Sequence, residues 1–172
     1  MKLILIINTL DDKQSLRTLE ERLKAGNYHY EIVNTADMEI KNCIGCNYCW
    51  LKTPGVCTIK DDYEMILKKI IKADQMWVVA DTHFGFISYK GKNILDRIMP
   101  IVTMNLHMKN GQMRHVMRYK KKTDFGVIYQ GDGDKEYLNR WAERVAINFA
   151  SRSLGAYSID ETEGIANAFG NY

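Results

Sequence analysis

Residues 76–99, MWVVADTHFGFISYKGKNILDRIM, contain the order of elements that decides the fold. Residues 76–80 form a continuous apolar run with two valines, which is typical of a strand buried on both faces of a sheet. Residues 89–99 have apolar side chains at helical spacing. A loop with two phenylalanines and one glycine joins these segments. A strand, a loop and a helix in this order are the repeating unit of α/β folds.

The same alternation of strand and helix runs along the rest of the chain. The further predicted strands are residues 3–7, 28–33, 125–129 and 154–159, and the further predicted helices begin near residues 11–15, at 61–62 and at 134, the last ending at 151. Such a chain builds a parallel sheet with right-handed crossovers and helices on both faces. We therefore predict an α/β fold, a flavodoxin-like doubly wound five-stranded parallel sheet of order 2-1-3-4-5. It is expected to form a single domain over residues 1–172, with a cysteine-rich insertion at about 41–60.

The bulk properties indicate an ordinary globular protein. Of the 172 residues, 46% are hydrophobic and 26% are charged, which excludes a disordered composition. The net charge of +3 is too small to indicate a nucleic-acid partner. The apolar run near the start is too short for a signal peptide or a membrane span. We expect a cytoplasmic protein with no membrane partner, in which thiols stay reduced.

Three loops follow predicted strands, so they are expected to meet at the carboxyl edge of the sheet. There is no G-x-G-x-x-G after the first strand and no G-x-x-x-x-G-K-[ST]. In the first loop, Thr9 and Ser15 offer hydroxyls to a phosphate, or belong to an ordinary helix cap. The candidate ring-binding residues of the other two loops are Phe84, Gly85, Phe86, Ser88 and Gly131.

These candidates have two interpretations. Phenylalanine rings, a glycine and a hydroxyl are suited to a flat heteroaromatic ligand. Alternatively, the two phenylalanines belong to the core, and Gly131 with Gly133 merely forms a turn.

All four cysteines lie within fifteen residues. Cys43, Cys46, Cys49 and Cys57 have the spacing C-x2-C-x2-C-x7-C, and Thr53-Pro54-Gly55 forms a turn before the last. Four convergent thiolates would suit a [4Fe–4S] cluster or a tetrahedral zinc. The compact triplet favours the cluster over zinc, which more often uses two separated pairs. A redox dithiol and plain packing remain alternatives.

Together, CIGCNYC, FGFIS and the helix residues Lys92, Asp96 and Arg97 resemble the flavodoxin-like NADPH-dependent FMN reductase superfamily, and within it the iron–sulfur flavoprotein branch. The resemblance implies FMN as cofactor, NAD(P)H as electron donor and a [4Fe–4S] cluster that exchanges electrons with FMN. It also implies a cytoplasmic oxidoreductase with a small-molecule or protein electron acceptor.

The first and second loops depart from the pattern of that family. The positions that differ are Asn8, Leu10, Asp11, Leu16 and Asp81. Asp11 would stand near the FMN phosphate, where like charges repel. An alternative function is therefore a non-enzymatic electron carrier or a flavin-free binding subunit.

Residues 99–122 contain five methionines and a set of basic residues, with no acid between Asp96 and Asp124. One interpretation is a basic surface over core methionines. The other is the edge of a homodimer or higher homo-oligomer that also attracts an anionic partner.

Overall fold

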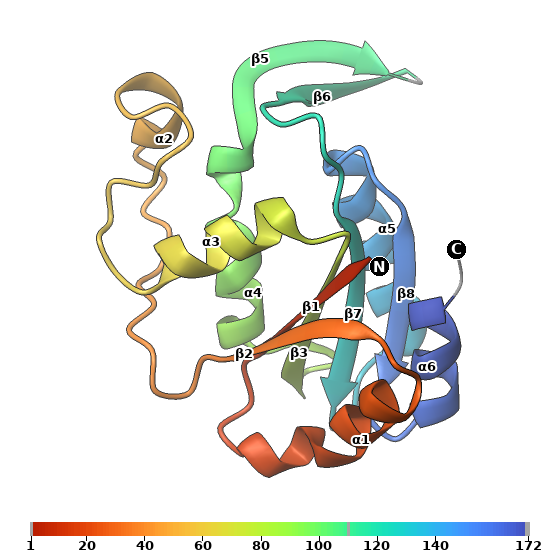
Figure 1. The fold of residues 1–172 in the computed structure, drawn as a ribbon. Coiled ribbons are helices and arrows are strands. Elements are labelled where there is room, and N and C mark those ends of the chain that lie inside the picture. Colours follow the sequence, from red (N-terminus) through yellow and green to blue (C-terminus); the bar gives the residue numbers. More distant parts are fainter. Residues whose placement is uncertain (1, 110, 171–172) are drawn as a thin grey trace.

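A computed structural model describes residues 2–109 and 111–170 of the chain (Figure 1). Its central sheet has the order β2-β1-β3-β7-β8, with all neighbouring pairs parallel. The strands of this sheet are β1 (Leu3–Asn8), β2 (His29–Asn34), β3 (Gln75–His83), β7 (Asp124–Gln130) and β8 (Ser153–Ser158). They are the five strands predicted from the sequence, so the predicted order 2-1-3-4-5 is confirmed.

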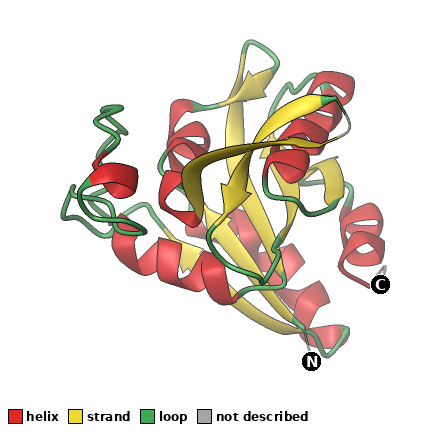
Figure 2. Cartoon of the chain, turned by 90° about the horizontal axis from the view of Figure 1, so that it is seen from above, coloured by secondary structure: helices red, strands yellow, loops and turns green. Residues whose placement is uncertain are grey.

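Helices cover both faces of the sheet (Figure 2). The helices are η1 (Lys13–Leu16), α1 (Arg17–Ala25), α2 (Tyr48–Leu51), α3 (Tyr63–Lys72), α4 (Tyr89–Asp96), η2 (Met99–Ile101), α5 (Lys135–Asn148) and α6 (Thr162–Gly170). One core cluster joins the sheet to α3, α4 and α5, and a second joins it to α1 and α6. Successive residues of β3 alternate between the clusters, since Val78 belongs to the first and Trp77 and Val79 to the second. A strand buried on both faces requires the unbroken apolar run seen in the sequence.

The first helix begins as the sequence predicts. The Asp12 side chain accepts a hydrogen bond from the Gln14 N–H at 2.8 Å and so caps η1. Leu19 and Leu23 of α1 are buried, and Gly26 ends the helix. This cap holds the loop after β1 at the carboxyl edge of the sheet.

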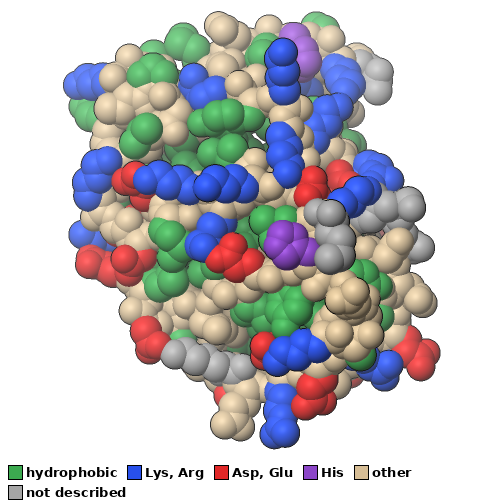
Figure 3. Space-filling view, viewed as in Figure 1, with side chains coloured by type: hydrophobic (Ala, Val, Ile, Leu, Met, Phe, Trp, Pro, Cys, Tyr) green, Lys and Arg blue, Asp and Glu red, His purple; other side chains and the backbone are tan. Residues whose placement is uncertain are grey.

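A β-hairpin over residues 102–117 was not predicted. Its strands are β5 (Val102–Lys109) and β6 (Gln112–Met117), and they form a separate antiparallel sheet that extends beyond the central one (Figure 1). Met104, Met108 and Met113 are 54%, 66% and 61% exposed, so the interpretation of these methionines as core is wrong. In the upper part of the space-filling view, where the hairpin lies, Lys and Arg side chains are interspersed with hydrophobic ones (Figure 3). The oligomer-edge interpretation stays a prediction.

The two-residue strand β4 (Phe86–Ile87) also escaped prediction, and it pairs antiparallel with the end of β3. No helix among the described residues is long and apolar enough to cross a membrane.

Candidate functional site

The loops after β3 and β7 are joined to each other at the carboxyl edge of the sheet. Gly85 and Gly133 form an isolated parallel bridge, and the Asp134 N–H donates to the Gly85 carbonyl at 2.9 Å. Gly131 has φ 99°, and a Cβ there would lie 2.9 Å from Thr82 Oγ1. Both the backbone conformation and the lack of space therefore require glycine at this turn. The result is a fixed rim of backbone beside the open end of the sheet.

The two phenylalanines of the second loop have different environments. Phe84 is fully exposed and has φ 53°, and it is followed by Gly85 with φ 78°. A left-handed conformation at a bulky residue stores about 1–3 kcal/mol and is concentrated at functional sites. Phe86 instead packs edge-on against Trp141, with ring centroids 4.9 Å apart. Phe84 is thus the accessible ring of this loop, while Phe86 supports the loop by packing on Trp141.

Ser88 carries an unused hydroxyl in the same loop. The residue is 3% exposed, and its Oγ has no hydrogen-bond partner among the described atoms. It occupies the N-cap position of α4, yet its side chain makes no capping bond. Leaving a buried hydroxyl unpaired costs about 1–3 kcal/mol. Such a group in a loop with an exposed aromatic ring indicates a missing polar partner.

The hydroxyls predicted to bind phosphate are already bonded within the chain. Thr9 is 2% exposed, and its Oγ1 donates to the Val79 carbonyl at 2.8 Å. The Ser15 Oγ donates to the Asp12 carboxylate at 3.1 Å. Neither hydroxyl proton is free for a phosphate in this conformation. The structure therefore brings both residues to the predicted edge without leaving them as open donors.

Asp11 has a counter-ion that the sequence did not reveal. The Lys90 Nζ lies 2.6 Å from Asp11 Oδ1, which ties the first loop to α4. The hydrogen bond that Asp11 accepts raises the pKa of Lys90 above its usual value. The negative charge of Asp11 is thus balanced at this edge. A cavity of about 160 Å³ lies beside the pair and is also lined by Thr9 and Asn93.

The four cysteines gather at the other end of α4. Cys43, Cys46, Cys49 and Cys57 all line one cavity of about 230 Å³, together with Arg97 from the end of that helix. Apolar walls come from Ile44, Ile59, Met99 and Pro100. The four thiols thus border one space, formed by the insertion and the end of α4, whereas their sharing of one metal centre stays a prediction. Figure 1 shows α2, within this insertion, far from the carboxyl ends of β3 and β7.

The thiols differ in their electrostatic surroundings. The Tyr48 N–H and the Thr58 hydroxyl, whose Oγ1 lies 3.9 Å from Cys46 Sγ, lower the pKa of Cys46. Burial, followed by the charges of the other three thiolates, raises the pKa of Cys49. Mutual repulsion of this kind is relieved by a cation between the sulfurs. The donor set is thus suited to a positively charged centre.

The arrangement of the four thiols bears on whether they are placed to hold a single metal ion. Among residues 2–109 and 111–170, no three His, Cys, Asp or Glu side chains are placed to hold one metal ion. A tetrahedral zinc with bonds of about 2.3 Å would need its sulfurs about 3.8 Å apart. An iron–sulfur cluster carries its own iron corners and accepts a wider set of thiolates. The four thiols therefore border one cavity without forming a ready single-ion site among the described residues.

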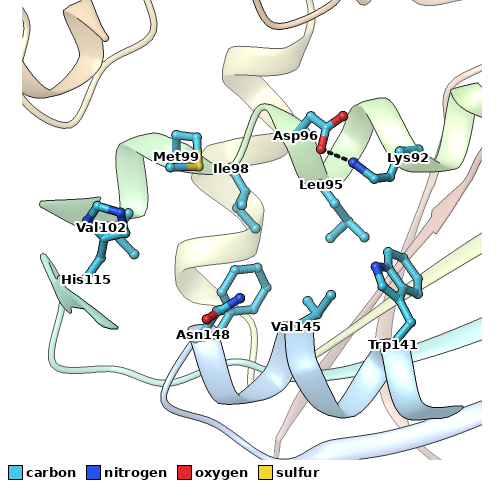
Figure 4. Close-up of a pocket in the computed structure, with 11 residues that line it drawn as sticks. Lys92, Leu95, Asp96, Ile98, Met99, Val102, His115, Trp141, Val145 and Asn148 are labelled. Carbon is cyan, nitrogen blue, oxygen red and sulfur yellow. Dashed lines mark hydrogen bonds and ion pairs between the residues drawn. The ribbon is translucent and has the colours of Figure 1, made fainter. Parts of the chain in front are cut away.

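A third cavity, of about 240 Å³, lies between α4, α5 and the hairpin, and no sequence pattern predicted it (Figure 4). Leu95, Ile98 and Val145 point into it, and the Lys92–Asp96 ion pair lies at its edge. His115 of β6 also lines it and stacks on Trp50, with centroids 4.8 Å apart. Only tertiary packing creates this space, because its walls come from segments far apart in the chain.

The comparisons with known proteins agree with this geometry. No protein-family model matches the chain. Its fold defines it as a flavodoxin-like α/β protein of the kind found in flavin-dependent reductases. RosB with a bound flavin intermediate has a TM-score of 0.66 at 14% identity, covering 99% of this chain and 77% of that one. An NAD(P)H:quinone oxidoreductase from Methanothermobacter marburgensis has a TM-score of 0.62 at 11% identity, covering 98% and 96%. An FMN-dependent NADH-azoreductase from Bacillus anthracis has a TM-score of 0.55 at 18% identity, covering 99% and 95%.

Two curated proteins are similar in sequence to part of this chain. The chain is 34% identical over 113 residues to an iron–sulfur flavoprotein of Archaeoglobus fulgidus, which is 64% of this chain and 55% of that protein. It is 41% identical over 71 residues to an iron–sulfur flavoprotein of Methanocaldococcus jannaschii, which is 41% of this chain and 36% of that protein. The matches thus span about half or less of these relatives. The resemblance to iron–sulfur flavoproteins that the sequence motifs indicated is confirmed.

Proposed function

We propose that this chain is an FMN-dependent oxidoreductase that takes electrons from NAD(P)H and delivers them to a small-molecule or protein acceptor. FMN supplies the redox chemistry when bound, because it accepts a hydride and can return single electrons. The cysteine insertion holds a [4Fe–4S] cluster in this proposal. The protein works in the cytoplasm as a homodimer or higher homo-oligomer.

The observation that carries the proposal is the unpaired Ser88 hydroxyl in the same loop as the exposed ring of Phe84. An aromatic face and a buried donor on one rigid loop are what a flat, partly polar ring needs. Gly85 lets the ligand approach the backbone, and Gly131 keeps the facing turn narrow. The half-buried Phe86 keeps the loop in place by packing on Trp141. In this proposal, these contacts orient the bound flavin ring and exclude water from it.

The first loop is proposed to receive the FMN phosphate. The start of a helix favours an anion, although the Gln14 N–H at the start of η1 already donates to Asp12. Lys90 is the cation within reach, although it is held by Asp11. For Thr9 and Ser15 to donate to the phosphate, their hydroxyls must first leave Val79 and Asp12. We therefore expect weaker FMN binding than a loop with free hydroxyls would give.

The cysteine cavity supports the second cofactor. All four thiols border it, and burial together with the charges of the other three thiolates raises the pKa of Cys49. The two proposed sites lie at opposite ends of α4, whose eight residues span about 12 Å. An electron passing between them within one chain would travel at least along this helix.

Anaerobic reconstitution with iron and sulfide, followed by FMN titration, tests the proposal. We expect about four irons per chain, broad visible absorbance and one FMN per chain. Cys57→Ala should lower the iron content, whereas Val56→Ala, which changes a neighbouring exposed side chain, should leave it unchanged. Oxidation of NADH or NADPH by the reconstituted protein completes the test. A wild-type chain that binds neither iron nor FMN would refute the proposal.

A second candidate is favoured by the bonded state of Thr9 and Ser15. A chain that cannot release these hydroxyls would be a flavin-free binding subunit or a cluster-only electron carrier. Such a protein would bind iron without FMN, or neither, and would not oxidise NAD(P)H. Iron and flavin analysis of the same sample separates the two candidates.

A further inference from the structure

Arg97 is a buried arginine at the junction of α4 and the cysteine insertion. The residue is 2% exposed, and its side chain has no exposed surface. The resemblance described above gives this position in a motif but assigns it no contact. Burying a guanidinium is costly unless it is paired and hydrogen-bonded, so its partners indicate its role.

The partners of Arg97 lie at both ends of the cysteine insertion. Its Nη1 donates to the Lys41 carbonyl at 2.9 Å and forms an ion pair with Asp61. The Asp61 carboxylate in turn accepts hydrogen bonds from two backbone groups, the Lys41 N–H at 2.8 Å and the Tyr63 N–H at 3.2 Å. One guanidinium and one carboxylate thus close the loop from residue 41 to residue 61 against α4.

The same guanidinium reaches the thiol set. Its Nη2 lies 3.5 Å from the Sγ of Cys57, within hydrogen-bond range for sulfur. Its Nε has no partner among the described atoms, although it is buried and Arg97 lines the cysteine cavity. The Tyr63 ring lies against the guanidinium of Arg97, with its centroid 4.6 Å from the guanidinium carbon. The Tyr63 hydroxyl donates a hydrogen bond to the Ile94 carbonyl at 2.7 Å. A rigid, permanently charged fork with a spare donor therefore faces the sulfurs.

We propose that Arg97 is the positioning residue of the cysteine site: it fixes Cys57 and both ends of the insertion, and its charge favours the reduced state of the centre. This rests on the proposed function, because it concerns the cluster proposed for these thiols. A centre ligated by four thiolates is anionic, and one-electron reduction adds a further negative charge. Hydrogen bonds to the sulfurs and a nearby cation lower the free energy of that charge.

The two parts of the proposal are separated by three variants. Arg97→Lys keeps the charge but replaces the planar fork with a single ammonium, so it tests positioning. The double variant Arg97→Met/Asp61→Asn removes the whole ion pair without leaving Arg97 or Asp61 buried alone, and Asp61→Asn removes only the carboxylate. The difference between these two variants tests the charge of Arg97. Arg118→Lys is the matched control. Arg118 is half-buried, adjoins the insertion at Gly55 and donates to the Pro100 carbonyl at 3.1 Å, with no cysteine among its recorded partners.

The measurements are iron loss to a chelator, the reduction equilibrium against a dye with dithionite as electron donor, and hydrogen exchange of residues 41–63 in the apo-protein. We expect Arg97→Lys to lose iron at least about 5-fold faster than wild type. Its amide hydrogens in residues 41–63 should exchange about 10-fold faster. Its reduction equilibrium should stay within about 3-fold of wild type. The double variant should shift that equilibrium at least about 10-fold toward the oxidised state relative to Asp61→Asn. Arg118→Lys should match wild type in all three.

Each outcome decides the proposal. If Arg97→Lys matches Arg118→Lys in iron loss and hydrogen exchange, Arg97 does not position the insertion. If the double variant has the same reduction equilibrium as Asp61→Asn, the charge of Arg97 does not act on the centre. If wild type binds no iron, the proposed cluster fails; faster exchange in apo Arg97→Lys would then still support the positioning role, and unchanged exchange would overturn it.

Discussion

Replacing Ser88 by alanine should leave the apo-protein at least as stable and weaken FMN binding. A serine at an N-cap normally contributes about 1 kcal/mol through its side-chain hydrogen bond. Ser88 makes no such bond, and its buried Oγ has no partner among the described atoms. Removing it therefore removes an unpaired polar group and no interaction.

The magnitudes follow from these contacts. An unpaired buried hydroxyl costs about 1–3 kcal/mol, so the free energy of unfolding of apo Ser88→Ala should be unchanged or higher by up to that amount. A hydrogen bond to FMN contributes about 0.5–1.5 kcal/mol, so the Kd for FMN should rise about 2- to 12-fold. Stability and affinity thus change in opposite directions.

Urea unfolding of the apo-protein and fluorescence titration with FMN measure the two quantities. Thr123→Val is the matched control, because Thr123 is also buried but donates to the Ile70 and Ala73 carbonyls, at 3.0 and 3.1 Å. This control should lose about 1 kcal/mol or more of stability without a change in FMN affinity. A Ser88→Ala protein that loses stability as Thr123→Val does, or that binds FMN as wild type does, would refute the reasoning.

Three further predictions concern the same elements. Asp11→Asn should release Lys90 and tighten FMN binding about 2- to 5-fold at low salt, with the gain lost in high salt, as titrations at two ionic strengths would measure. Gly91→Ala should lower the free energy of urea unfolding by about 1–3 kcal/mol, because the new Cβ would lie 2.6 Å from the Ala80 Cβ; an unchanged midpoint would contradict this. Burial raises the pKa of Asp61, but hydrogen bonds from Arg97 and the Lys41 N–H outweigh it and hold that pKa below its ordinary value. The stabilisation is therefore present above about pH 4 and lost as the pH falls through the folded pKa, so the stability deficit of Asp61→Asn should shrink in acid and not stay constant.

The sequence by itself determined the central sheet and the class of the protein. Residues 3–7 and 76–80 are unbroken apolar runs because helices cover both faces of these strands. Burial on both faces therefore produces a local sequence pattern that can be recognised without the structure. The motif around Phe84 and Ser88 likewise predicted a flavin-like loop. The spacing of the cysteines predicted a shared thiol site.

Only the tertiary structure decided how distant side chains pair. It separated Phe84, which is exposed, from Phe86, which packs on Trp141. It gave Asp11 its counter-ion on α4, and it exposed the methionines of a hairpin that has little apolar alternation. It also set Arg97 against Cys57, 40 residues away in the chain. Periodicity reports which side of an element is buried, whereas these contacts depend on how α4 and the insertion pack on the sheet, and no local pattern in the sequence records that packing.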